Sequence, residues 1–165
     1  MQQLIDLYKQ WSGNEPASVD KMQGAGSNRQ YFRLTATDGS SVVGVIGTSR
    51  EEDHAFINIA KQFAEQKLPV PQVLAVSDDE MRYLQTDLGS TSLFDAIRGG
   101  REAGGRYNLA EQELLKKTIR ALPGIQIRGA RGMDWSVCYP QPEFNEESVL
   151  FDLNYFKYCF LKPTE

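Results

Sequence analysis

The hydrophobic pattern changes its period along the first half of the chain. Apolar side chains recur at helical spacing near the amino terminus, and Gly13 follows them as a stop signal. Alternation then predicts a strand over residues 31–36 and a valine-rich return strand over residues 41–46. Asp38-Gly39 predicts a hairpin turn between them, because these residues tolerate the positive φ angles of a tight turn. The helical positions are Leu4, Leu7, Tyr8 and Trp11.

A second helix is predicted over residues 49–67. Ser49 and Glu52 fit a capping box at its start, and one of its sides is apolar. Pro69 ends this helix because proline cannot continue the hydrogen-bond ladder. Two further strands are predicted over residues 72–76 and 81–85, joined by an acidic turn.

The second half of the chain favours helices. A short helix is predicted over residues 92–97, and the Gly- and Arg-rich residues 98–106 are expected to form a solvated loop. Asn108 resembles the start of another helix, which Pro123-Gly124 should close. Residues 149–161 are nearly all apolar or aromatic, as in a buried helix. Strands first and helices later predict an α+β fold. The expected inward positions after Asn108 are Leu115, Ile119 and Leu122.

Composition narrows the class of protein. The 165 residues are 41% hydrophobic and 24% charged, which is ordinary for a folded domain. The net charge of −4 argues against a nucleic-acid partner, which usually meets a basic surface. No apolar run approaches the ~18 residues that span a membrane, so no membrane association is expected. Cys138 and Cys159 lack metal-ligand spacing, and we expect both to be reduced and packed, as in a cytoplasmic protein.

The segment QGAGSNRQYFRL, residues 23–34, permits two interpretations. It is either an ordinary loop between two strands or a loop whose glycines let the backbone approach phosphate oxygens. In the second case backbone N–H groups, the Ser27 hydroxyl and the Arg29 guanidinium would be the donors. The P-loop and dinucleotide patterns do not fit, because no Gly-Lys-Ser/Thr and no helix follow. Protein kinases place a Gly-rich turn between two strands over the ATP phosphates.

Further segments occur in the order found in kinases. They are SVVGVIGTSREEDHAF (41–56), LPVPQVLAV (68–76) and YLQTDLGSTSLFDAI (83–97), with YPQPEFN and FDLNYFKYCFL nearer the end. Together with GSNRQYFRL (26–34), they resemble the aminoglycoside phosphotransferase-like small-molecule kinases, in particular the branch of N-acetylmuramate and N-acetylglucosamine anomeric kinases. The resemblance implies a protein-kinase-like N-lobe, an antiparallel sheet plus a helix, over residues 1–88. Residues 89–165 would hold the first helices of an incomplete C-lobe.

The same resemblance implies a nucleotide site. ATP with Mg²⁺ would be the cofactor, and a sugar or amino sugar would be the substrate of the full-length enzyme. Adenine would pair with the backbone carbonyl of Thr86 and the backbone N–H of Leu88. Either Glu51 or Glu52 matches the helix acid that orients the phosphate-binding lysine of kinases, although both acids also suit a helix start. The expected nucleotide-binding residues are Gly24, Gly26, Ser27, Asn28, Arg29, Glu52, Thr86 and Leu88.

The chain departs from the kinase pattern in two respects. Kinases carry a lysine on the second hairpin strand, but residues 42–47 read VVGVIG. Arg29 is the nearest replacement, with Arg33 behind it, and arginine would contact phosphate through a fork instead of a point charge. No segment after residue 151 resembles a catalytic loop with its metal-binding aspartate. We therefore expect no catalytic residue or Mg²⁺ ligand in this chain, and no phosphate transfer by the chain alone.

Two functions remain open at this point. The chain is either part of an ATP-dependent small-molecule kinase or a non-catalytic nucleotide-binding or interaction module built on a kinase N-lobe. In both cases the apolar segment 149–161 is expected to lack partners and to permit self-association.

Overall fold

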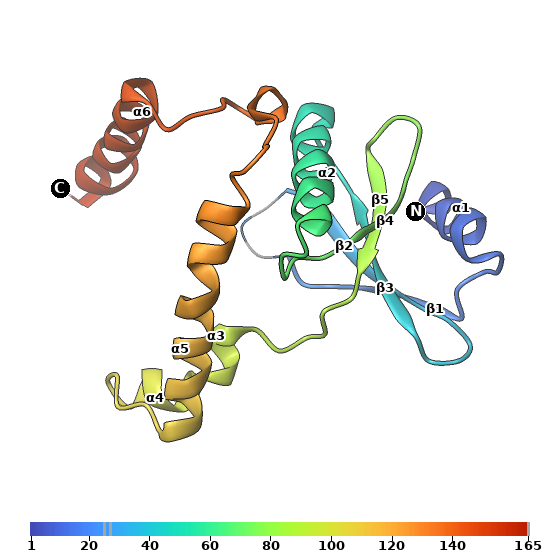
Figure 1. Cartoon of the computed structure of the whole chain (residues 1–165), viewed down its shortest axis with the longest axis horizontal. Helices are drawn as coiled ribbons and strands as arrows, with labels where there is room; N and C mark the ends of the chain where they lie inside the picture. Colours follow the sequence, from blue (N-terminus) through green and yellow to red (C-terminus); the bar gives the residue numbers. More distant parts are fainter. Residues whose placement is uncertain (25, 27, 165) are drawn as a thin grey trace. The chain divides into compact units, whose positions relative to one another are not determined.

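The computed structural model describes residues 1–24, 26 and 28–164. The chain forms two compact units, one from Met1 to Met133 and the other from Asp134 onward. The first unit contains a five-stranded sheet and five α-helices among its described residues, and the second contains short helical segments. In Figure 1 the sheet of the first unit is blue to green, and the last helix of the second unit is red.

The sheet of the first unit is antiparallel throughout, in the order β1-β2-β3-β5-β4. The predicted hairpin forms between β2 and β3, and Gly39 adopts a φ of 84° at its turn. The predicted antiparallel sheet is confirmed, and its strands begin and end within a few residues of the predicted bounds. The strands are β1 (Ser18–Lys21), β2 (Gln30–Thr35), β3 (Ser41–Ile46), β4 (Val73–Val76) and β5 (Arg82–Thr86).

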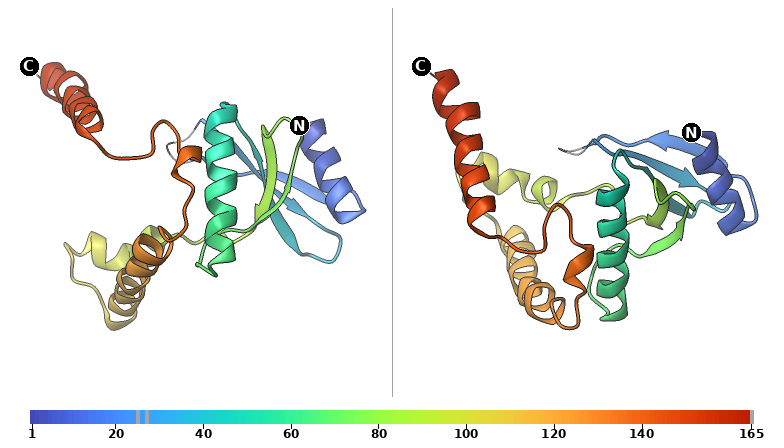
Figure 2. Two further views of the ribbon diagram at one scale, coloured as in Figure 1. Left: turned by 45° about the horizontal axis from the view of Figure 1, so that its top comes forward. Right: turned by 90° about the horizontal axis from the view of Figure 1, so that it is seen from above.

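Two helices cover opposite faces of this sheet (Figure 2). Helix α1 (Gln2–Ser12) packs its buried apolar side chains against Phe32, Leu34 and Leu84. Helix α2 (Arg50–Glu65) lies on the other face, where Ile57 packs with Val43, Val45 and Tyr83. Side chains of successive strand residues point to opposite faces, which is why neighbours such as Val42 and Val43 belong to different clusters.

The rest of the first unit is helical, with two corrections to the sequence analysis. Residues 98–102 form helix α4 and not a loop, because Gly100 lets Tyr107 pack against the backbone and donates its N–H to Glu111. Helix α5 ends at Pro123 as predicted, and a π-helical turn follows it. Ile119 and Leu122 are 63% and 43% exposed, so two of the expected inward positions of α5 were also wrong, whereas Leu115 is half-buried. The elements are α3 (Leu93–Ala96), α4 (Arg98–Glu102), α5 (Leu109–Pro123) and η1 (Gly124–Arg128).

The second unit exposes much of its apolar surface. Helix α6 and the π-helical turn η3 carry large apolar side chains that are about half exposed or more, Phe151 among them at 69%. Cys138 is half-buried and Cys159 is exposed, and both are free thiols, so the expected packing of Cys159 was wrong. None of the described helices has the length and apolar character needed to cross a membrane. The elements are η2 (Trp135–Val137), α6 (Glu146–Phe156), η3 (Lys157–Leu161) and η4 (Lys162–Thr164).

Candidate functional site

The Gly-rich segment, residues 22–29, connects the antiparallel strands β1 and β2. Lys21 pairs with Phe32, and the N–H of Met22 donates to the carbonyl of Tyr31 at 2.8 Å, so the ladder extends to the base of the segment. Gly26 has a φ of 73°, a backbone conformation that favours glycine. Gly24 and Asn28 are exposed, whereas Ser27 lies outside the described residues. The segment therefore joins two antiparallel strands, as both an ordinary loop and a phosphate-binding turn would.

Arg29 ends this segment and turns toward the start of α2. Its Nη2 lies 2.9 Å from a carboxylate oxygen of Glu52, and its Nε lies 2.9 Å from Oδ1 of Asp53. The Nη2 group also donates to the backbone carbonyl of Glu52 at 3.2 Å. The Arg29 side chain is only 11% exposed, and its guanidinium lies 5.3 Å from the ring centre of Phe56. A cation is therefore held between the Gly-rich segment and the helix.

The structure distinguishes the two candidate acids at the helix start. The Ser49 hydroxyl oxygen accepts a hydrogen bond from the N–H of Glu52, which confirms Ser49 as the N-cap. The Glu52 side chain pairs with Arg29, so the predicted capping box is only half formed. Glu51 instead accepts a hydrogen bond from the Ser49 hydroxyl. Of the two acids, Glu52 is the one that faces the Gly-rich segment.

Burial sets the electrostatics around Arg29. Asp53 has no exposed surface, and burial raises the pKa of its carboxyl above the ordinary value, against the opposing charge of Arg29. Burial also raises the pKa of the Tyr83 hydroxyl, which lies in the same cluster. Burial acts to lower the pKa of Arg29, but the tyrosines and acids around it outweigh this effect and raise it. Arg29 therefore stays a cation in a low-dielectric setting, where its field is strong.

Gly47 directly follows β3, the strand that was expected to carry a lysine. Gln30 pairs with Ile46, so Arg29 and Gly47 are the next residues on the two neighbouring strands. A Cβ atom at Gly47 would lie 1.4 Å from Oδ2 of Asp53, so a side chain does not fit there. The positive charge nearest to this end of β3 in the described cluster is that of Arg29, which precedes β2.

The other end of β3 faces the segment expected to bind adenine. Thr86 pairs with Val42, its N–H donates to the carbonyl of Gln72 at 3.0 Å, and the Leu88 side chain is exposed. Between them Asp87 receives a two-pronged contact from Arg33, with Nε–Oδ2 at 2.5 Å and Nη2–Oδ1 at 3.0 Å. The backbone N–H of Gly89 also donates to Asp87. Arg33 therefore fixes this segment and does not join the Arg29 cluster.

The two predicted ends of the nucleotide site lie along one strand. At one end of β3, Val42 pairs with Thr86. At the other end, Gly47 follows the residue that pairs with Gln30, so Val42 and Gly47 are five residues apart. At the usual rise of a strand, this corresponds to roughly 17 Å. An elongated ligand with a flat ring at one end and anionic groups at the other suits this separation.

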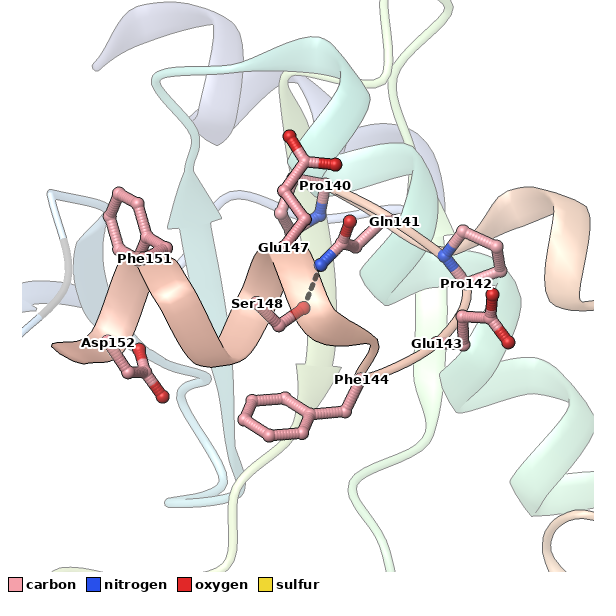
Figure 3. Close-up of a pocket in the computed structure, with 9 residues that line it drawn as sticks. All are labelled: Pro140, Gln141, Pro142, Glu143, Phe144, Glu147, Ser148, Phe151 and Asp152. Carbon is pink, nitrogen blue, oxygen red and sulfur yellow. Dashed lines mark hydrogen bonds between the residues drawn. The ribbon is translucent and has the colours of Figure 1, made fainter. Parts of the chain in front are cut away.

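An open hollow of about 810 Å³ lies in the second unit, around the start of α6 (Figure 3). Phe144, Phe151 and three carboxylates line it, and the Gln141 amide donates a hydrogen bond to the Ser148 hydroxyl across its floor. Nearly all of its lining side chains are exposed. No residue of the expected nucleotide set lies there, and we assign it no function.

Asp53 and Gly47 were missed by the sequence analysis. Asp53 stands in the run Glu51-Glu52-Asp53, which reads as the solvated first turn of a helix. The available signal was Gly47, a glycine at the end of a valine-rich strand that was expected to carry a lysine. Only the packing of α2 on the sheet shows that the Asp53 carboxylate lies where a side chain of residue 47 would be.

Most of this chain is similar in sequence to part of a curated protein. Over 134 residues it is 31% identical to a protein of Neisseria meningitidis serogroup B named N-acetylmuramate/N-acetylglucosamine kinase. The match covers 81% of this chain and 36% of that relative, so the chain spans about a third of the curated relative it matches. No family model matches the chain. The similarity supports a relationship to kinases.

Proposed function

We propose that this chain is the nucleotide-binding part of an ATP-dependent kinase that phosphorylates a sugar or amino sugar. The observation that carries the proposal is the ion pair between Arg29, at the end of the Gly-rich segment, and Glu52, in the first turn of α2. Protein kinases form a comparable ion pair between a lysine, which lies on the strand after the hairpin, and a glutamate of the following helix. The printed name of the Neisseria relative supports the sugar class.

The residues of the first unit fit a nucleoside triphosphate. Arg29 offers a forked cation, and Gly24, Gly26, Ser27 and Asn28 would bring backbone and side-chain donors to the phosphates. Thr86 and Leu88 would hold adenine through main-chain groups. ATP with Mg²⁺ would supply the phosphoryl group. In this proposal the catalytic base and the Mg²⁺ ligands belong to the remainder of a longer protein, since the relative is more than twice as long as the matched part.

The test is sugar-dependent release of ADP by the whole protein, with N-acetylmuramate and N-acetylglucosamine as acceptors. Arg29→Ala should raise the KM for ATP several-fold and leave the KM for the sugar unchanged, because a charge-assisted contact is worth ~1.5–3 kcal/mol. Asp6→Asn on the exposed side of α1 serves as the control. Absence of sugar-dependent ADP release would refute the kinase function. An unchanged KM for ATP in Arg29→Ala would remove Arg29 from the site.

A second candidate, an interaction module, is favoured by the exposed apolar side chains of α6 and η3. Phe151, Tyr155 and Phe160 are each more than half exposed. Apolar surface of this kind marks an association site, and self-association is the simplest form. Sedimentation velocity of the 165-residue chain should show dimers or larger species, and Phe151→Glu should return it to a monomer. A monomer at all concentrations would contradict this candidate.

A further inference from the structure

A buried carboxylate lies directly behind the cation of the proposed phosphate site. Asp53 has no exposed surface, and its ion pair with Nε of Arg29 is 2.9 Å long. In the described part of the chain, neither carboxylate oxygen accepts a hydrogen bond of good geometry, so the ion pair is the contact that offsets the buried charge. A carboxylate is costly to bury without a cation beside it, so the position of Asp53 depends on Arg29 and that of Arg29 on Asp53.

Gly47 provides the space that the Asp53 carboxylate fills. A Cβ atom at Gly47 would overlap Oδ2 and would lie 2.4 Å from Cγ. A side chain at this position therefore requires the Asp53 carboxylate to move. The position of the Asp53 carboxylate thus depends on the missing side chain of Gly47 and on the charge of Arg29.

The two acids beside Arg29 hold different parts of its guanidinium. Glu52 contacts Nη2 and is 44% exposed, so water and ligands reach this contact. Asp53 contacts Nε and has no access to solvent. The Asp53 contact is thus the one of the two that solvent does not reach.

We propose that Asp53 is a positioning residue that holds Arg29 at the end of the Gly-rich segment for contact with a nucleotide phosphate. This inference rests on the proposed function. Asp53 is buried and acts through Arg29 without touching the nucleotide. A purely structural ion pair would affect folding, but it would not distinguish ligands with phosphates from ligands without them.

The test compares ATP with adenosine in the whole protein by calorimetry. Asp53→Asn should weaken ATP binding by about tenfold to a hundredfold, the loss usual when a group that orients a ligand-binding side chain is removed from a metal site. Adenosine affinity should not change, because adenosine has no phosphate. In an Arg29→Ala background, Asp53→Asn should cause no further loss, since the two residues act as a unit. Asp6→Asn makes the same change on the surface of α1 and should leave both affinities unchanged.

Gly47→Ala tests the same step without removing the buried acid. The new methyl group displaces the Asp53 carboxylate and should reproduce the loss that is specific to ATP. If ATP binding weakens in Arg29→Ala but not in Asp53→Asn or Gly47→Ala, Asp53 does not position Arg29. The role of Arg29 in the proposed site would then stand without this inference. Equal losses for ATP and adenosine would assign a structural role and overturn it as well. No ATP binding by the unaltered protein would refute the proposed function and this inference with it.

Discussion

Two arginines four residues apart, Arg29 and Arg33, form ion pairs of different construction. Arg33 donates hydrogen bonds to both carboxylate oxygens of Asp87. The Asp87 carboxylate also accepts hydrogen bonds from the Ser41 hydroxyl and the N–H of Gly89. Arg29 divides its contacts between one buried acid and one exposed acid. The first pair satisfies its carboxylate fully, whereas the second leaves the buried carboxylate with one partner among the described residues.

The carboxyl pKa values show the same difference. Hydrogen bonds from Arg33 hold the pKa of Asp87 well below its ordinary value, despite partial burial. Burial raises the pKa of Asp53, and Arg29 only partly offsets this effect. An acid surrounded by donors stabilises the fold in its charged form. An incompletely satisfied buried acid is common at functional sites, which supports a structural role for Arg33 and the proposed ligand-binding role of Arg29.

The largest expected effect is the loss of the Asp87 carboxylate. Asp87→Asn removes the partner of Arg33 and should lower the free energy of unfolding by about 3 kcal/mol, the lower end for a buried pair, because Arg33 is partly exposed. Urea denaturation measures this change. Glu113→Gln, in an exposed pair with Lys116, should cost less than ~1 kcal/mol. Equal losses in the two variants would mean that Arg33 and Asp87 do not form a structural clamp.

The pH dependence of stability should have opposite signs at the two acids. Asp87 is deprotonated more readily in the folded state, so its contribution is present above its ordinary pKa of 3.8 and is lost as the pH falls further. Asp53 binds its proton more tightly in the folded state, so its contribution grows as the pH falls from its raised pKa toward 3.8. Each acid changes the free energy of unfolding by at most ~1.4 kcal/mol per pH unit.

Urea denaturation between about pH 7 and about pH 3 measures both slopes. The stability difference between the unaltered chain and Asp87→Asn should shrink on acidification below 3.8. Compared with Asp53→Asn, the unaltered chain should gain free energy of unfolding as the pH falls from the raised pKa of Asp53 toward 3.8. Slopes of the same sign would contradict the distinction between a satisfied and an unsatisfied acid.

The sequence predicted the sheet well because its signals are local. Asp38-Gly39 specified the hairpin, the valine-rich run specified β3, and Ser49 specified the start of α2. The errors came where tertiary contacts overrode local signals. Gly100 reads as part of a loop, yet its missing side chain lets Tyr107 pack against a helical turn.

The candidate site was predicted only in part. Arg29 follows from the absence of a lysine in residues 42–47 and its place after two glycines. The choice between Glu51 and Glu52 depends on the rotation of α2 about its axis, which the sequence does not give. Asp53 requires knowledge that α2 packs against Gly47, a contact between residues of different elements. The roles of Thr86 and Leu88 remain predictions. They depend on backbone groups, which every residue type provides, so the side chains at these positions carry no signal.

The smallest effect should be that of Glu52, the exposed partner of Arg29. Glu52→Gln should lower the free energy of unfolding by only ~0.2–1 kcal/mol, since exposed ion pairs contribute little. The backbone carbonyl of Glu52 still accepts from Arg29 in this variant. The loss should diminish as salt rises from about 0.1 M to about 1 M, because the screening length falls from ~10 Å to ~3 Å. The loss in Asp87→Asn should hardly change with salt, since that carboxylate is only 7% exposed. Equal salt dependence in the two variants would show that Glu52 is as shielded as Asp87. That result would contradict the description of Glu52 as the solvent-exposed partner of Arg29.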